Sequence, residues 1–263
     1  MTATVTAVAD VDLDEVRGQI RAMYRDVARD PGGDFHFEMG RALAKRLGYP
    51  QDWLDAVPPE ALASYAGVGH MLDLAGLRPG DRVLDLGSGA GTDAFIAGHL
   101  VGPSGAVVGI DMTEEQLGKA RTLRDQAGIE HVCFLHGYVE APPVEPASFD
   151  AVISNGVLNL VPDKARAFAA AAAAMRPGGR LAIADIVSAR ELRPRTRANT
   201  QLWAACIAGA VPLERYVQAI RDAGLSVEAV RLNPGYRFLS QRALEAVAIY
   251  GAVSVSIQAV KAA

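Results

Sequence analysis

The sequence contains few cysteines, no excess of basic residues and no long apolar run. Only two of its 263 residues are cysteines, Cys133 and Cys206, so no disulfide framework is implied. Lys and Arg number 26 against 30 Asp and Glu, and the resulting charge of −4 gives no electrostatic reason to expect nucleic acid as a partner. No stretch reaches the roughly 20 apolar residues of a membrane span, and the N-terminus lacks the pattern of a signal peptide. We therefore expect a cytoplasmic protein with no nucleic-acid or membrane partner.

What is present is a regular alternation of strand and helix patterns from Asp81 onward. Strand patterns cover residues 82–86, 106–111, 131–136, 149–154, 180–186 and 225–231. Helical patterns cover residues 92–101, 113–127, 162–176 and 213–223. Short strands separated by helices are typical of βαβ units, so we predict an α/β fold with a mainly parallel sheet. The residues 253–260 alternate with period two and predict an antiparallel strand at the sheet edge.

The N-terminal part of the chain is helical by pattern. Residues 12–29 carry apolar side chains at helical spacing, a second helical stretch runs to about Leu47, and two short helices lie around Asp52 and over 59–66. We predict a helical cap over residues 1–75 and one sheet-bearing domain over 76–263, which together form one structural unit. An insert at 187–212 follows the fifth strand and carries Trp203 and Cys206.

The stretch Val83–Asp93 reads V-L-D-L-G-S-G-A-G-T-D, a buried strand, a turn with three glycines and the start of a helix. Glycine permits positive φ and lets a ligand approach the backbone, and the free N–H groups of the new helix point at that ligand. The dinucleotide fingerprint requires glycine where Thr92 stands. The Gly-Lys-Ser/Thr ending of a P-loop is also absent.

The segment D-L-G-S-G-A-G-T-D instead resembles motif I of the class I methyltransferases that use S-adenosylmethionine (SAM). The resemblance implies a Rossmann-like fold: a mainly parallel seven-stranded sheet with an antiparallel last strand. It also implies SAM as cofactor, S-adenosylhomocysteine (SAH) as product, and a turn that holds the amino-acid end of SAM. The expected cofactor-binding residues are Tyr24, Asp85, Gly87, Ser88, Gly89, Gly91, Asp111, Met112, Tyr138, Val139 and Asn155.

Three of these expectations leave alternatives open. The carboxylate of Asp111 can accept two hydrogen bonds from the ribose diol, with Met112 against the adenine, or it can cap the helix that starts at Thr113. Many relatives carry Asp where Tyr138 stands, so Tyr138 would contribute backbone contacts or stack on the purine. Tyr24 would close over the SAM carboxylate or merely pack.

Four further segments, at residues 109–113, 154–160, 162–166 and 203–210, are similar to the arsenite methyltransferases. That resemblance implies three cysteine thiolates around trivalent arsenic, whose softness suits thiolate ligands. Only Cys206 is kept, since Val68 and Gly156 stand at the other two positions. One thiolate cannot chelate arsenic. We therefore expect methyl transfer by in-line displacement to a small organic acceptor, with arsenite methylation as the alternative.

The candidate catalytic residues are His36 and His70, which lie in the cap where this family places its acceptor and would act as a base or remain structural. The expected substrate pocket consists of His36, His70, Gly156, Trp203 and Cys206, although Trp203 and Cys206 could instead form the core of the insert. No metal site is predicted, because His36 and Glu38 have no third ligand nearby in the sequence. The alternatives from other classes are an NAD(P)-dependent reductase and a non-catalytic SAM-binding protein. Monomer and homodimer both remain open.

Overall fold

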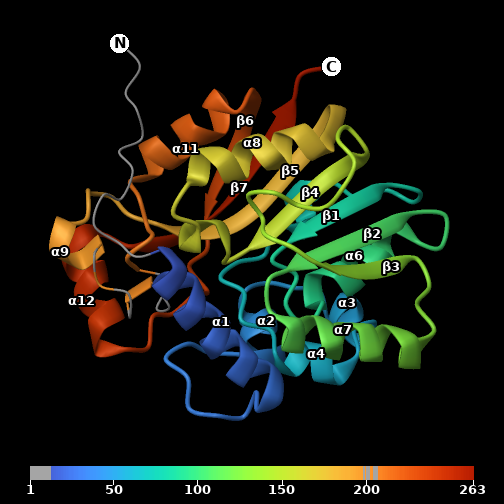
Figure 1. The fold of residues 1–263 in the computed structure, drawn as a ribbon, viewed down its shortest axis with the longest axis horizontal. Coiled ribbons are helices and arrows are strands. Elements are labelled where there is room, and N and C mark those ends of the chain that lie inside the picture. Colours follow the sequence, from blue (N-terminus) through green and yellow to red (C-terminus); the bar gives the residue numbers. More distant parts are fainter. Residues whose placement is uncertain (1–12, 198, 200–201, 204–206) are drawn as a thin grey trace.

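The computed structural model describes residues 13–197, 199, 202–203 and 207–263. Its centre is a seven-stranded sheet with the order β3-β2-β1-β4-β5-β7-β6 (Figure 1). The strands are β1 (Arg82–Leu86), β2 (Ala106–Asp111), β3 (Val132–His136), β4 (Phe149–Asn155), β5 (Met175–Val187), β6 (Leu225–Leu232) and β7 (Val253–Lys261). The predicted α/β class and all seven predicted strands are thus confirmed, with a mainly parallel sheet and an antiparallel last strand.

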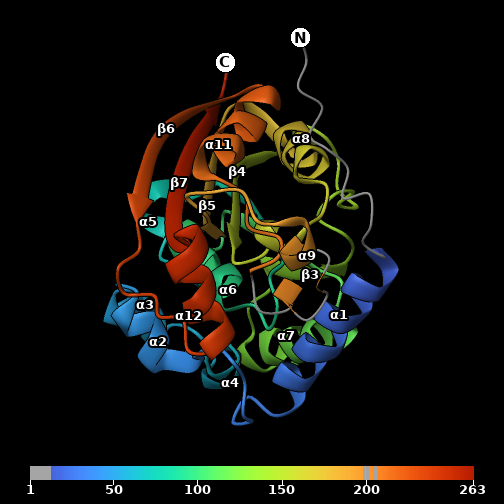
Figure 2. The same ribbon diagram turned by 90° about the vertical axis from the view of Figure 1, so that its left-hand side faces the viewer.

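The predicted position of the last strand at the sheet edge is wrong. β7 lies between β5 and β6 and pairs with both in antiparallel direction, so β6 forms the edge (Figure 2). The polar residues of the alternation do not face water. Ser254 and Ser256 are buried, and their hydroxyls donate to the carbonyl oxygens of Val68 and His70 in the cap. The alternating pattern of β7 therefore arises because the serines on one face of the strand donate hydrogen bonds to backbone carbonyls of the cap.

Helices cover both faces of the sheet. One face carries α8 (Lys164–Ala174) and α11 (Leu213–Asp222), and the other carries α5 (Leu72–Ala75), α6 (Thr92–Val101) and α7 (Glu114–Ala127). The remaining described helices are α1 (Leu13–Arg29), α2 (Gly40–Arg46), α3 (Gln51–Asp55), α4 (Pro59–Ala63), the 3-10 turn η1 (Leu158–Leu160), α9 (Pro194–Arg197) and α12 (Gln241–Tyr250). The sequence analysis did not predict helices α5 and α12.

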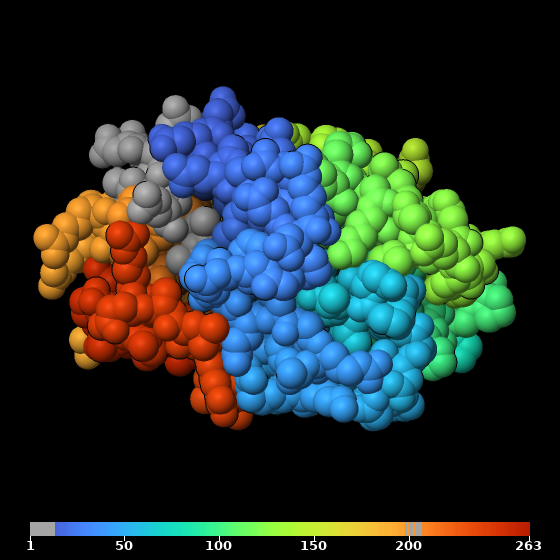
Figure 3. Space-filling model, turned by 90° about the horizontal axis from the view of Figure 1, so that it is seen from below, coloured from blue at the N-terminus to red at the C-terminus, as the bar shows by residue number. Residues whose placement is uncertain are grey.

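The N-terminal helices lie against the rest of the chain. Helix α1 packs on α7, where Gln116 and Lys119 donate to the carbonyl oxygens of Tyr24 and Ala28. From below, the N-terminal segments lie between the red C-terminal part and green α7 (Figure 3). Within the described ranges, no helix is both long and apolar enough to cross a membrane.

Candidate functional site

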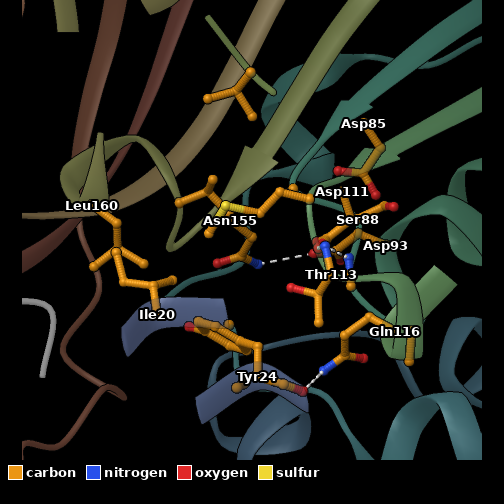
Figure 4. Close-up of a pocket in the computed structure, with 18 of the residues that line it drawn as sticks. Ile20, Tyr24, Asp85, Ser88, Asp93, Asp111, Thr113, Gln116, Asn155 and Leu160 are labelled. Atoms are coloured by element: carbon orange, nitrogen blue, oxygen red, sulfur yellow. Dashed lines mark hydrogen bonds between the residues drawn. The ribbon is translucent and has the colours of Figure 1, made fainter. Parts of the chain in front are cut away.

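The main cavity lies at the carboxyl ends of β1, β2 and β4, beneath α1 (Figure 4). It holds about 1060 Å³, including space open to solvent. An open parallel sheet presents ligands at this edge, because the loops that follow neighbouring strands diverge there. The segment after β3 also lines the cavity, so the site is built from four strand ends together with α1, the segment 64–67 and the start of α7.

The glycine turn begins directly after β1. Gly87 and Ser88 both donate their N–H groups to the carbonyl oxygen of Ile110, over 2.7 and 2.9 Å, which ties the turn to β2. Gly87 has a φ of +78°, and a Cβ there would lie 2.3 Å from Val157, so only glycine fits. Gly89 also has positive φ, but the nearest atom to its missing Cβ is Oε1 of Gln116 at 3.9 Å. The turn is thus open toward the cavity at Gly89.

Asp111, at the end of β2, joins the turn to the start of α7. One carboxylate oxygen accepts the N–H of Gly89 at 2.9 Å and the other accepts the N–H of Thr113 at 2.8 Å. Burial raises the pKa of Asp111, and these backbone hydrogen bonds oppose that rise. Asp111 also lines the cavity. The structure thus shows a carboxylate that bonds to the N-cap residue of α7 and also lines the cavity; the ribose contact stays a prediction.

Three buried polar atoms that belong to cavity-lining residues have no hydrogen-bond partner in the described part of the chain. They are Oδ2 of Asp85, Oγ of Ser88 and Oε1 of Gln116. Burial and the charges of Asp93 and Asp111 raise the pKa of Asp85 well above its ordinary value. Unpaired buried acceptors are costly, so they suit a ligand that supplies positive charge and N–H or O–H donors. SAM has an ammonium group, a sulfonium and ribose hydroxyls, so these residues fit the predicted cofactor.

Asn155, at the end of β4, lines the cavity but is engaged with the cap. Its Oδ1 accepts the N–H of Val68 at 2.8 Å, while Nδ2 donates to the carbonyl of Gly69 at 2.9 Å and to Asp93 at 3.0 Å. Tyr49 donates to the other oxygen of Asp93 at 2.6 Å. Burial raises the pKa of Asp93 to about 6. Asn155 therefore holds the loop 67–69 onto the sheet, a role different from the expected cofactor contact.

The sequence analysis missed Asp93, Tyr49 and Tyr65, which belong to this network. Tyr65 and Asp93 line the cavity, and Tyr65 donates to the carbonyl oxygen of Gly69 at 3.1 Å. The position of Asp93 directly after the glycine turn was the one available signal. Nothing in the sequence pairs it with tyrosines more than 25 residues away.

Nearly all predicted cofactor residues meet at the main cavity. Those that line it are Tyr24, Asp85, Gly87, Ser88, Gly89, Asp111, Met112, Tyr138, Val139 and Asn155. Gly91 does not line it, because its α-carbon faces the rings of Phe134 and Phe95, where a Cβ would lie within 3 Å. The ring of Tyr138 lies 5.3 Å from the guanidinium of Arg17 on α1. These placements leave the individual cofactor contacts as predictions.

Neither candidate catalytic histidine lines the main cavity. His36 lines a smaller second cavity beside Tyr24, Ala66 and Val68. His70 is buried and packs its ring on Tyr49 at 4.4 Å between centroids, and burial lowers its pKa. His70 lines neither of these two cavities, so the structure favours a structural role for His70 over a role as a base.

The predicted substrate-pocket residues are brought together only in part. A Cβ on Gly156 would lie 3.3 Å from Cγ1 of Val68, so these two positions face each other. Trp203 is 2% exposed, its Nε1 donates to the carbonyl of Arg197 and it does not line the main cavity, so its place in a substrate pocket stays a prediction. Cys206 lies outside the described residues. Among the residues that the structure describes, no cluster of His, Cys, Asp or Glu could hold a metal ion.

Known proteins are similar to this chain over the sheet-bearing part that carries the glycine turn. A family model described as "Methyltransferase domain" matches residues 77–235. The arsenite methyltransferase of Halobacterium salinarum is 37% identical over 243 residues, which cover 87% of this chain and 61% of that protein. This chain thus spans about three-fifths of the length of that relative.

Solved structures give the same fold. The crystal structure of an arsenic(III) S-adenosylmethionine methyltransferase from Chlamydomonas reinhardtii is 30% identical, with a TM-score of 0.63 over 86% of this chain and 75% of that chain. A geranyl diphosphate methyltransferase in complex with SAM gives a TM-score of 0.65 at 21% identity, over 86% of this chain and 98% of that chain.

Proposed function

This chain belongs to the methyltransferase-domain family of SAM-dependent enzymes, and we propose that the protein transfers the methyl group of SAM to a small-molecule acceptor by in-line displacement. The observation that carries the proposal is the set of unpaired buried polar atoms on Asp85, Ser88 and Gln116 beside the open glycine turn. An NAD(P)-dependent reductase is disfavoured by the family match and by the absence of the dinucleotide fingerprint.

SAM supplies an electrophilic methyl group on a sulfonium, and its transfer leaves the neutral thioether of SAH. The chain's contribution is to bind and orient. Asp111 and the N–H of Gly89 fix the turn, and Asp85 and Ser88 present acceptors to the amino-acid end. Alignment of donor and nucleophile supplies most of the rate enhancement in such a displacement. A base is needed only where the acceptor must lose a proton.

Buried carboxylates give the cavity a negative potential. Asp85 and Asp93 are buried, Asp111 is partly buried, and the charges of Asp93 and Asp111 raise the pKa of Asp85. A cationic cofactor relieves this repulsion, whereas the neutral SAH does so only through its ammonium group. The same carboxylates therefore favour binding of SAM and release of SAH.

The relatives favour arsenite as acceptor over the organic molecule that the sequence analysis preferred. Both the Halobacterium protein and the Chlamydomonas structure are named for methylation of trivalent arsenic. Arsenite is accordingly the first acceptor to assay. Because two of the three cysteines of the family are replaced, the remaining thiol ligands would come from free thiols in solution.

One observation favours an uncharged organic acceptor as the second candidate. At the two positions where the resemblance expects cysteines, Val68 and Gly156 lie in van der Waals range of each other. Val68 is 2% exposed and Gly156 carries no side chain, so these positions offer arsenic no soft ligand, and an organic acceptor would need none.

The test combines purified full chain, SAM, excess thiol and arsenite, with methylated arsenicals measured by chromatography and mass spectrometry. The expected outcome is thiol-dependent product, formed faster by the Val68→Cys/Gly156→Cys variant because its two new thiolates face each other. No product from either protein, with SAM still bound, would overturn arsenite and leave the organic candidate. SAM binding without turnover of any acceptor would indicate the non-catalytic alternative.

A further inference from the structure

The main cavity has an apolar end opposite its carboxylates. Ile20 and Tyr24 of α1 line it together with Val157, Leu160 and Val161, which follow β4. In Figure 4, Leu160 and Ile20 lie together, on the side away from Asp85 and Ser88. The contacts expected for the cofactor involve the polar end and Tyr24, so Ile20, Val157, Leu160 and Val161 are lining that those contacts leave unused.

This apolar surface begins beside the glycine turn. Side-chain atoms of Val157 lie 2.3 and 2.7 Å from the position that a Cβ on Gly87 would occupy. The turn and the first residue of the apolar surface are thus in direct contact. A molecule on this surface would lie next to the turn that is expected to hold SAM, within reach of a methyl group carried on the cofactor's sulfonium.

Buried charges hold the apolar surface in place. The ammonium of Lys164 donates to the carbonyl oxygens of Asn159 and Val161, over 3.2 and 3.0 Å. The carboxylate of Asp185 accepts the N–H of Asn159 at 2.7 Å. Both side chains are buried, and burying a charged group is unfavourable unless it is paired and hydrogen-bonded. The turn before Leu160 is therefore fixed at both its N–H and its carbonyl.

The backbone of the insert packs on the carbonyl group of Asn159. A Cβ on Gly209 would lie 1.8 Å from the carbonyl oxygen of Asn159, so the insert backbone makes close contact there. Tyr216 of α11 donates to Asp185 at 2.6 Å. Helix α8, strand β5 and the insert thus hold Leu160 and Val161 in place beside the cavity. The apolar end is therefore a fixed part of the structure.

The charges around the cavity exclude anionic acceptors. The carboxylates of buried Asp85 and Asp93 and of partly buried Asp111 line it. Among the described lining residues, Arg17 is the one cation, and it forms an ion pair with Glu140 at 3.1 Å. An anion at the apolar end would thus meet repulsion with no free cation in the described lining.

We propose that the end formed by Ile20, Val157, Leu160 and Val161 is the acceptor subsite and selects an uncharged molecule with an apolar body. This assignment rests on the proposed methyl transfer and narrows the acceptor to one chemical class. Lys164 and Asp185 are positioning residues, since they act through the backbone of Asn159.

The test uses two probes of the same shape, 2-naphthol and naphthalene-2-sulfonate, titrated into the full chain saturated with SAH and measured by calorimetry. We expect 2-naphthol to bind at least about tenfold more tightly than the sulfonate, because the anion meets buried carboxylates. Leu160→Asn should weaken 2-naphthol about fivefold or more and leave SAH affinity within about twofold. Lys164→Met should also weaken 2-naphthol.

Matched controls separate the subsite from general damage. Leu244, which is 48% exposed on α12, gives the same substitution away from the cavity, and Leu244→Asn should change neither affinity. If Leu160→Asn fails to fold, the nearly isosteric Val161→Thr replaces it and should weaken 2-naphthol as well.

Equal affinity for the two probes, or no effect of either cavity variant, would overturn the subsite. Failure of 2-naphthol to bind the SAH-saturated protein would do the same. Failure of SAH itself to bind would instead refute the proposed function, so the two failures are distinguishable.

Discussion

Replacing Asp111 with asparagine keeps the side-chain volume and converts one carboxylate oxygen into an NH₂ group. In the native protein the two oxygens accept N–H groups from Gly89 and Thr113, at 2.9 and 2.8 Å. The new NH₂ must face one of these donors, so one hydrogen bond to a charged group is lost. Such a bond contributes about 1.5–3 kcal/mol.

The same substitution removes the negative charge that the ribose hydroxyls would meet. The affinity for SAM should therefore fall by about 1.5–3 kcal/mol, which corresponds to a dissociation constant about 10- to 150-fold higher. Calorimetric titration with SAM measures this directly, and thermal unfolding of the same sample checks that the protein is folded.

The matched control is Glu114→Gln, which removes one charge from the exposed first turn of α7. Its affinity for SAM should stay within about twofold of the native value, since exposed charges are screened. A folded Asp111→Asn protein that binds SAM as tightly as the native protein would refute the role assigned to Asp111.

Three other substitutions test separate parts of the site. Gly89→Ala should fold and lose SAM binding. Gly76 has nearly the same φ (+54° against +53°) and similar open space, so Gly76→Ala should lose the same amount of stability in urea unfolding but keep SAM binding. Normal SAM binding by Gly89→Ala would exclude the turn as the cofactor site. Burial raises the pKa of Asp93 to about 6, so the folded protein keeps a proton that the unfolded chain releases, and the free energy of unfolding should fall as pH rises from about 4 to 6. Asp93→Asn should reduce that slope, and identical slopes in urea titrations at several pH values would contradict the assignment. Tyr216→Phe removes the 2.6 Å hydrogen bond to Asp185 and should lower the free energy of unfolding by about 1.5–3 kcal/mol, a prediction that an unchanged urea midpoint would contradict.

The strand positions could be predicted because each strand carries a local signal. The runs 82–86 and 149–154 are apolar and lie between polar or turn residues, so both were placed within one residue of their observed bounds. The start of β5 was missed. The chain pairs with β4 already at Met175, across a register shift, and the pattern 162–176 alone does not reveal that pairing.

The cofactor end of the site was predicted better than the acceptor end. Gly87, Gly89 and Asp111 act through backbone conformation and strand-end position, which are local properties. The apolar end depends on Leu160, Ile20 and the residues that fix them, which come from distant segments. Trp203 likewise belongs to a core cluster that it shares with residues of the cap and of α6, which the sequence does not reveal.

The sequence by itself determined the sheet, the glycine turn and the carboxylate that follows β2, because hydrophobic period, glycine spacing and the strand–helix–strand length are encoded over short distances. Only the tertiary structure decided that Asn155 holds the cap, that Asp93 meets Tyr49, and that Lys164 and Asp185 are buried behind Leu160. Those contacts join residues from separate elements, and buried polar groups take whichever partners the packed fold brings within hydrogen-bond distance. A local sequence pattern therefore does not predict these hydrogen-bond partners.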